Sequence, residues 1–228
     1  MDRKIALLLF GMSKMTYQHW SQKKGILEIN YMNSYSNYQE YIFEYFQKRG
    51  YQVDVYLATN NMSNPDKKEL IDTYKPISYS FNRNLKNKIR SRNDKIEKVI
   101  DLCLQSQIKY DLVLITRFDL LFKKKFNEIN INLKRFNLVS ELEKKKLICD
   151  NFYLFPYTVL KQFSKLVKRK RNVSFHKIKA DIQKIKSIQG RFGSGFVSYI
   201  SNDRKNIGSL SFYSIVRTKI DSKKTIKN

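Results

Sequence analysis

Unbroken runs of apolar residues mark the strands that organise this chain. Residues 112–115 are apolar without alternation and include two β-branched side chains, which is typical of a strand buried on both faces of a sheet. Residues 4–10 have the same character and end at Gly11, a residue that lets the backbone approach a ligand closely. The two runs predict central strands of one sheet.

Segments with helical spacing of apolar residues alternate with segments that read as strands. This alternation predicts an α/β fold with a mostly parallel central sheet flanked by helices. The predicted helices are residues 36–49, 64–75 and 96–104, and the predicted strands among them are residues 51–58 and 77–81.

The pattern is looser before residue 36 and after residue 122. We predict one domain over residues 1–217 with a basic C-terminal part, followed by a flexible basic tail at residues 218–228. The remaining predictions are a long loop at 15–34, a surface excursion at 123–132, strands around 136–140, 147–155 and 210–216, and helices after Pro156 and around 175–188.

Composition adds a strong positive charge to this picture. The formal net charge is +25, and residues 151–228 contain 18 Lys and Arg against 3 Asp and Glu. A solvated lysine-rich face, a patch for phosphate-bearing ligands and a peripheral contact with an acidic membrane surface all remain open. No run reaches the length of a membrane span, so we expect a cytoplasmic protein, with Cys103 and Cys149 as buried thiols.

Chemically useful side chains follow the predicted strands. Arg117 and Asp119 come directly after the central strand, Lys14 follows the first strand, Thr59 follows the second, and Asp150 lies in a later strand region. Because parallel strands present their carboxyl ends at one edge, we expect these groups to meet there. Arg117 and Asp119 could equally form a structural ion pair.

Four features give the sequence a resemblance to a known family. They are Phe10-Gly11 after the first strand with a cation close behind, Tyr-Asp-Leu-Val-x-x-Thr-Arg-Phe-Asp-Leu-Leu at 110–121, Asp150-Asn151-Phe152-Tyr153, and a predicted helix that contains His176. Over residues 4–217 the chain resembles the small GT-A-fold, nucleotide-sugar-dependent glycosyltransferases of capsule-polysaccharide loci and large DNA viruses. The resemblance implies transfer of a sugar from a nucleoside-diphosphate sugar to a glycan or other hydroxyl acceptor, in the host cytoplasm if the protein is viral.

The resemblance also implies roles for individual residues. Asp119 would bind Mn²⁺ or Mg²⁺ on the donor diphosphate, and His176 would complete the metal shell, although a lone histidine is more often a packing residue. Asp150 would act as general base toward the acceptor or, on the alternative reading, cap a turn. The expected donor-binding residues are Phe10, Gly11, Lys14, Thr59, Arg90, Arg92, Arg117 and Asp119.

Two positions depart from the family pattern. Arg117 stands where the first aspartate of an Asp-x-Asp motif is expected, and Lys14 stands where arginine is usual. These departures leave a single-carboxylate metal site or a metal-independent enzyme in which Arg117 itself neutralises phosphate charge. They also leave open an inactive glycosyltransferase-like protein, and the charge leaves open a non-catalytic nucleic-acid-binding protein, although no specific nucleic-acid motif is present.

Overall fold

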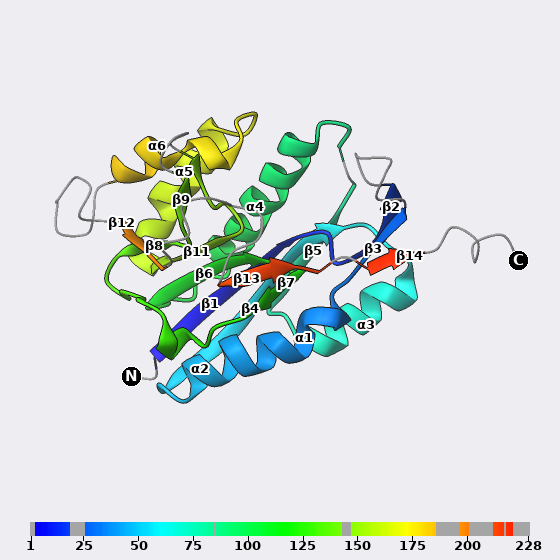
Figure 1. Ribbon diagram of the computed structural model, residues 1–228, viewed down its shortest axis with the longest axis horizontal. Coiled ribbons are helices and arrows are strands. Elements are labelled where there is room, and N and C mark those ends of the chain that lie inside the picture. Colours follow the sequence, from blue (N-terminus) through cyan, green and yellow to red (C-terminus); the bar gives the residue numbers. More distant parts are fainter. Residues whose placement is uncertain are drawn as a thin grey trace, which may run out of the picture.

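A seven-stranded sheet forms the centre of the molecule, with helices on both of its faces (Figure 1). The structure is a computed structural model that describes residues 3–18, 26–83, 85–142, 147–185, 197–200, 212–216 and 218–220. In spatial order the strands are β12 (Val197–Tyr199), β8 (Phe136–Leu138), β11 (Phe152–Pro156), β6 (Leu112–Arg117), β1 (Arg3–Gly11), β4 (Tyr51–Asn60) and β5 (Ser78–Asn82). Only β11 runs antiparallel to its neighbours in this sheet, so the predicted mostly parallel α/β fold is confirmed.

The order of the strands reverses at β1. The chain places β4 and β5 on one side of β1 and then crosses over to place β6 on the other side. In open α/β sheets such a reversal leaves a crevice outside the carboxyl ends of the two central strands, where ligands bind. The register brings Phe10 opposite Arg117 and Gly11 opposite Thr59 at that edge.

Alternating side chains of β1 supply two separate hydrophobic cores. Ile5, Leu7 and Leu9 face one core, together with α1 (Met32–Tyr38), α2 (Glu44–Gln47) and α3 (Asn64–Tyr74). Ala6, Leu8 and Phe10 face the other core, together with α4 (Lys88–Gln105), α5 (Leu160–Arg169) and α6 (Lys179–Gln183). Burial on both faces is the reason that the strand reads as a continuous apolar run.

Helix boundaries follow local signals in the sequence. A π-helical turn, Gln39–Phe43, joins α1 to α2, and Gly50 then adopts a φ of +75° that glycine tolerates best. The side chain of Ser63 accepts a hydrogen bond from the amide of Asp66 at the start of α3, and the side chain of Asn87 caps α4 through the amide of Arg90. Short 3₁₀ turns occupy Phe126–Glu128, Tyr157–Val159 and Phe175–Lys177.

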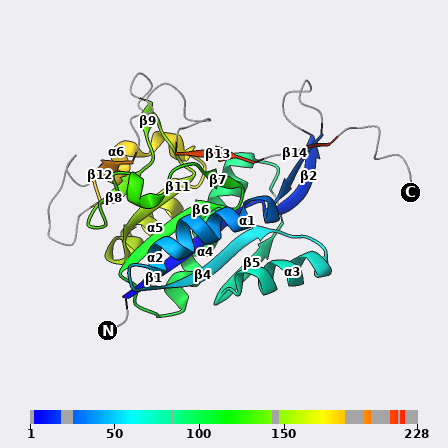
Figure 2. The same ribbon diagram turned by 60° about the horizontal axis from the view of Figure 1, so that its bottom comes forward.

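The long loop predicted at residues 15–34 is wrong. This region contains β2 (Lys14–Gln18) and β3 (Ile26–Asn30), which pair antiparallel, and then the start of α1. The predicted tail also begins differently, since β14 (Thr218–Ile220) pairs with the other edge of β3 at one end of the molecule (Figure 2). Residues 221–228 lie outside the described residues. The chain thus returns at its end to a segment near its beginning, which no local pattern reveals.

The segment after residue 122 is anchored rather than lying wholly on the surface. Phe126 is 1 % exposed and packs against aromatic rings from four other segments. Nearby, β7 (Leu120–Phe122) pairs with β13 (Tyr213–Ile215), while β9 (Glu141–Leu142) pairs with β10 (Leu147–Ile148). Among the described residues, no helix combines the length and apolar character that crossing a bilayer requires.

Candidate functional site

An ion pair between Arg117 and Asp119 lies at the carboxyl end of β6. The Nε and Nη2 atoms of Arg117 donate to the two carboxylate oxygens of Asp119 at 2.7 and 2.6 Å. The Asp119 side chain is 2 % exposed and that of Arg117 is 15 % exposed. Burial alone would lower the pKa of Arg117, but the charges of Asp119 and Asp150 outweigh it and raise that pKa. The sequence left open that Arg117 and Asp119 form a structural ion pair, and the geometry shows that pair.

A second ion pair lies beside the first. Arg92, in the first turns of α4, donates from Nη1 to a carboxylate oxygen of Asp150 and from Nη2 to the backbone carbonyl of the same residue. Its guanidinium carbon lies 5.4 Å from the ring centroid of Phe10, close enough for a cation–π contact. Three predicted site residues from three segments thus meet next to the end of β1.

His176 faces Asp150 rather than Asp119. Its Nδ1 lies 2.7 Å from the carbonyl oxygen of Ile148, so this nitrogen must carry a proton to form a hydrogen bond. Its Nε2 lies 3.4 Å from the second carboxylate oxygen of Asp150. Asp150 therefore lies between Arg92 and His176, and its side chain is only 5 % exposed.

Tyr213 is a further residue of the site, and no pattern in the sequence indicates it. Its hydroxyl accepts a hydrogen bond from Asn151 at 2.9 Å and lies 2.8 Å from Sγ of Cys149, while Oδ1 of Asn151 lies 3.5 Å from Nη1 of Arg117. Tyr213 reaches this place because β13 pairs with β7, a contact across about 90 residues. No local signal could identify it, whereas Asn151 follows Asp150 directly and was visible in the sequence.

Thr59 and Lys14 lie at the same edge of the sheet but have structural partners. The Thr59 hydroxyl is buried and bonds to the hydroxyl of Ser13 at 2.8 Å and to its amide at 3.1 Å, so it holds the loop after β1. Nζ of Lys14 donates to Asp66 at 2.7 Å and to Glu69 at 3.2 Å, both on α3. The hydrogen bond with Asp66 is the main reason that the pKa of Lys14 is raised. The ammonium group of Lys14 is therefore paired with acids of α3 and does not point toward Arg92 and Arg117 as a further phosphate-binding cation would.

Gly11 and Arg90 differ in their relation to the site. Gly11 has a φ of +110°, which strains any residue with a side chain, and apart from Gly11 and its chain neighbours no atom of the described residues lies within 4 Å of where a Cβ would stand. It therefore leaves open space at the end of β1, as expected for a ligand-facing turn. Arg90 is exposed in the first turn of α4, and its backbone amide bonds to the cap at Asn87. Arg92, two residues later, is the arginine that reaches the site.

The residues present do not fit the divalent cation that the family resemblance implies. Both oxygens of Asp119 are engaged by Arg117, and Asp150 is shared between Arg92 and His176. No group of three or more His, Cys, Asp or Glu side chains is arranged to hold a metal ion among the residues that the structure describes. A cation next to Asp119 would also lie next to the guanidinium of Arg117, which repels it.

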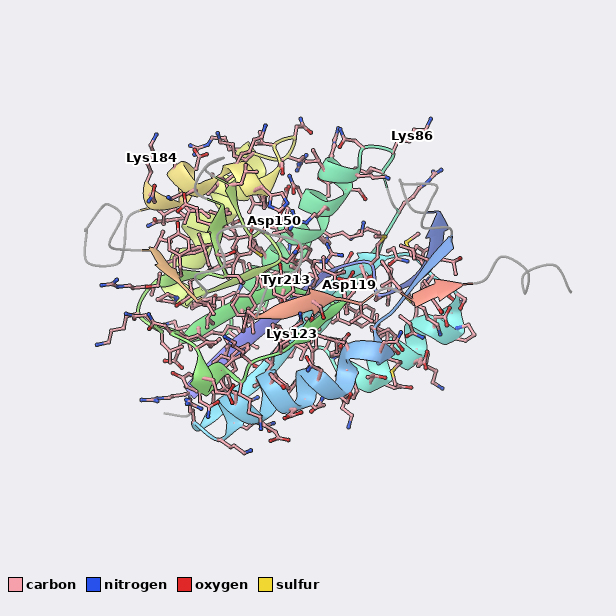
Figure 3. The ribbon with its side chains drawn as sticks, viewed as in Figure 1. Lys86, Asp119, Lys123, Asp150, Lys184 and Tyr213 are labelled. Carbon is pink, nitrogen blue, oxygen red and sulfur yellow. The ribbon has the colours of Figure 1, made fainter. Side chains whose placement is uncertain are left out.

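The arrangement suits a different task, the binding of an anion. The hydrogen bonds within the protein use two of the five N–H groups of Arg92 and three of those of Arg117. Figure 3 shows Asp119, Asp150 and Tyr213 together in the middle of the molecule, and Lys86 and Lys184 at its periphery. Two arginines held in place at the switch point of the sheet can bind a phosphate-bearing group without first having to become ordered.

A cavity of about 350 Å³ lies elsewhere, between the end of β5 and the outer side of α4. Its lining carries both signs of charge, with Lys95, Lys98 and Arg171 beside Asp94 and Glu97, and it includes none of the predicted site residues. Arg171 pairs with Glu97 at 2.7 Å there. This cavity therefore belongs to an ion-pair network between α4 and the end of α5.

Comparison with known proteins finds a match in structure but none in sequence. No family model matches the chain, and no curated protein matches its sequence. A crystal structure of a glycosyltransferase involved in the glycosylation of the major capsid of PBCV-1 is similar, with a TM-score of 0.43 and 12 % sequence identity over 87 % of this chain and 82 % of that chain.

Proposed function

We propose that this chain is a glycosyltransferase that uses a nucleoside-diphosphate sugar as donor and a hydroxyl group of a glycan or other molecule as acceptor. The observation that carries the proposal is the convergence of Phe10, Arg92, Arg117 and Asp150, from four separate segments, on the switch point of the sheet. These are residues that the sequence pattern had selected for donor binding and catalysis. The place and the chemistry both suit a phosphate-bearing ligand.

Arg117 and Arg92 would bind the diphosphate of the donor. When the bond between the sugar and the diphosphate breaks, negative charge develops on the leaving phosphate, and positioned cations stabilise that charge. Guanidinium groups bind phosphate through two parallel hydrogen bonds, which also fixes its orientation. Asp119 is then a positioning residue that holds Arg117, and transfer proceeds without a divalent cation.

Asp150 holds Arg92 and so is also assigned a positioning role. A general base must present an oxygen lone pair to the acceptor hydroxyl, and each carboxylate oxygen of Asp150 already has a partner, Arg92 or His176. The general-base role predicted from the sequence stays a prediction. Asp150→Asn discriminates between the two roles, because the amide still accepts a hydrogen bond from Arg92 but cannot take up a proton.

The aromatic side chains give no support to the alternative of a nucleic-acid-binding protein. Stacking on bases requires exposed rings, and Tyr79, at 47 % exposure, is the one aromatic side chain among the strongly exposed apolar residues of the described part of the chain. Among the described residues, many phenylalanine and tyrosine rings are fully buried in the two cores. The net charge alone does not discriminate between nucleic acid and other polyanions.

Thermal shift measurements with UDP-, GDP- and dTDP-sugars test the proposal, with single-stranded DNA at physiological salt as the comparison. A ligand at about 100 times its Kd stabilises a protein by about 2.7 kcal/mol, which raises the Tm of a chain of this length by about 5 to 10 °C. We expect such a shift with one class of nucleotide-sugar. A shift with DNA and with none of the nucleotide-sugars contradicts the proposal.

A further inference from the structure

The turn that leads into α4 exposes apolar side chains next to cations. Leu85 is 39 % exposed and Ile89 is 42 % exposed, which places both among the most exposed large apolar residues of the described chain. Four cationic side chains surround them in sequence, and all four are exposed: Arg83, Lys86, Lys88 and Arg90. We refer to these six residues as the α4 entry patch.

The cations of the α4 entry patch have no acidic partner in the part of the chain that the structure describes. No ion pair among the described residues includes Arg83, Lys86, Lys88 or Arg90. Figure 3 shows Lys86 at the outer edge of the molecule, with its side chain directed away from the body. The four cations of this turn therefore form no ion pair within the described segments, although Arg83 lines the same cavity as Asp94, Glu97 and Asp101.

The longer basic cluster at the end of α5 behaves differently. Lys168 pairs with Asp101, Arg169 and Lys170 pair with Asp181, and Arg171 pairs with Glu97. The cluster that stands out most in the sequence is thus neutralised by its own neighbours.

We infer that the α4 entry patch docks on a membrane surface that contains anionic lipids. A nucleic acid would satisfy the four cations but would gain nothing from Leu85 and Ile89, since phosphate backbones bind charge and base recognition here has no aromatic platform. A bilayer satisfies both components, because lysine and arginine bind anionic headgroups while leucine and isoleucine enter the acyl boundary. The four cations suit the headgroup layer of such a surface, and Leu85 and Ile89 suit the acyl boundary beneath it.

The position of the patch is compatible with the proposed site. Arg92 follows Arg90 on the same helix and reaches Asp150 inside the molecule, so the helix that carries the patch also carries a site residue. Docking through the start of α4 would hold the carboxyl edge of the sheet near the lipid headgroups. The inference does not depend on the sugar transfer, because it concerns different side chains.

Sedimentation with lipid vesicles tests the docking surface. We expect the full chain to bind vesicles of phosphatidylcholine with 30 % phosphatidylserine, and to bind pure phosphatidylcholine vesicles weakly. Each cation near an anionic surface contributes about a fivefold factor in partitioning, so Lys86→Glu with Lys88→Glu should weaken binding by about twentyfold or more. Leu85→Ser with Ile89→Ser should weaken it by about tenfold at unchanged charge.

The matched control carries the same change of charge at another exposed place. Lys161 and Lys165 are exposed on α5 and have no ion-pair partner among the described residues, so Lys161→Glu with Lys165→Glu should bind vesicles nearly as wild type does. Equal losses in the two charge variants would show binding by general charge and would overturn the inference. So would unchanged binding by the Leu85 and Ile89 variant, or an absence of binding at physiological salt. All six substitutions are at exposed positions, and the Tm of each variant verifies its fold.

Discussion

The guanidinium of Arg117 grips both carboxylate oxygens of Asp119, two residues further along the chain. The strand β6 ends at Arg117, so the pair is formed by residues that are local in sequence and yet buried at the carboxyl edge of the sheet. A carboxylate with this partner serves to hold an arginine. That relationship favours a positioning role for Asp119 over the metal-ligand role that the resemblance implies, and it leads to different expectations for the substitution of Asp119.

Asp119→Ala should destabilise the fold. Removing one partner of a buried ion pair leaves an uncompensated charge and costs about 3 to 5 kcal/mol of unfolding free energy. Replacing both partners with apolar residues of similar size, as in Arg117→Met with Asp119→Leu, should be much less harmful. Urea denaturation of the three chains measures these differences. A change below about 1 kcal/mol for Asp119→Ala would show that the pair is not buried as described.

Arg92 should contribute to donor binding, whereas Arg90 should not. A hydrogen bond to a charged group contributes about 1.5 to 3 kcal/mol, so Arg92→Lys should weaken nucleotide-sugar binding by roughly 10- to 150-fold, because lysine keeps the charge but loses the fork. Arg90→Lys is the matched control, with an exposed side chain two residues away. Isothermal titration calorimetry gives both values of Kd. Equal affinities in the two variants would remove Arg92 from the site.

Phe126 should be one of the main stabilising residues of the core between the sheet and helices α1, α2 and α3. Its side chain is 1 % exposed, and truncation of such a ring costs about 3 to 5 kcal/mol. The rings that pack against it are those of Tyr45, Phe46, Phe122, Phe152 and Phe212. Phe126→Ala should therefore lower the free energy of unfolding by this amount, whereas Tyr79→Ala, at 47 % exposure, should change it by no more than about 0.5 kcal/mol. Similar values for the two variants would place Phe126 outside the core.

Cys103 and Cys149 should be unreactive in the folded protein. Burial raises the pKa of both thiols to about 12, and the thiolate is the reactive form. At pH 8 a thiol reagent such as 5,5′-dithiobis(2-nitrobenzoic acid) should modify them at least about a hundredfold more slowly than in urea. Rapid modification of either thiol without denaturant would contradict its burial.

The same two thiols give a pH dependence of stability. Their pKa is higher in the folded state than the value of about 8.5 for an unfolded thiol, so their contribution is complete below that pH and is lost as the pH rises toward about 12. The free energy of unfolding should fall between pH 8.5 and 10.5. It should fall less steeply in Cys103→Ala with Cys149→Ala, and an identical slope in that variant would assign the effect to other groups.

Much of the fold could be predicted from the sequence because its signals are local. The buried strands at residues 4–10 and 112–115 are continuous apolar runs, and the stop at Gly50 and the proline near the start of α3 delimit helices. The parallel sheet follows from the alternation of these elements. The β2, β3 and β14 sheet could not be predicted, since its strands are short and one of them comes from the other end of the chain.

The position of the candidate site could be predicted from the sequence, but the contacts of its side chains could be predicted only in part. The rule that ligands bind at the carboxyl ends of the strands selected Arg117, Asp119 and Asp150, which do meet. What each side chain contacts depends on distances that a sequence does not contain. Lys14 illustrates this limit, because the cation close behind the first strand is held by the acids of α3. Tyr213 illustrates it too, because its approach depends on pairing between β7 and β13.

The most direct test of the central claim is calorimetric titration of the wild-type protein with its preferred nucleoside-diphosphate sugar, once in EDTA and once in Mn²⁺. If guanidinium groups hold the diphosphate, the Kd in EDTA should lie within about threefold of the Kd in Mn²⁺, a difference of less than about 0.7 kcal/mol. Arg117→Lys should weaken both by about tenfold or more. Binding that requires Mn²⁺ and disappears in Asp119→Asn would contradict this account and restore Asp119 as a metal ligand.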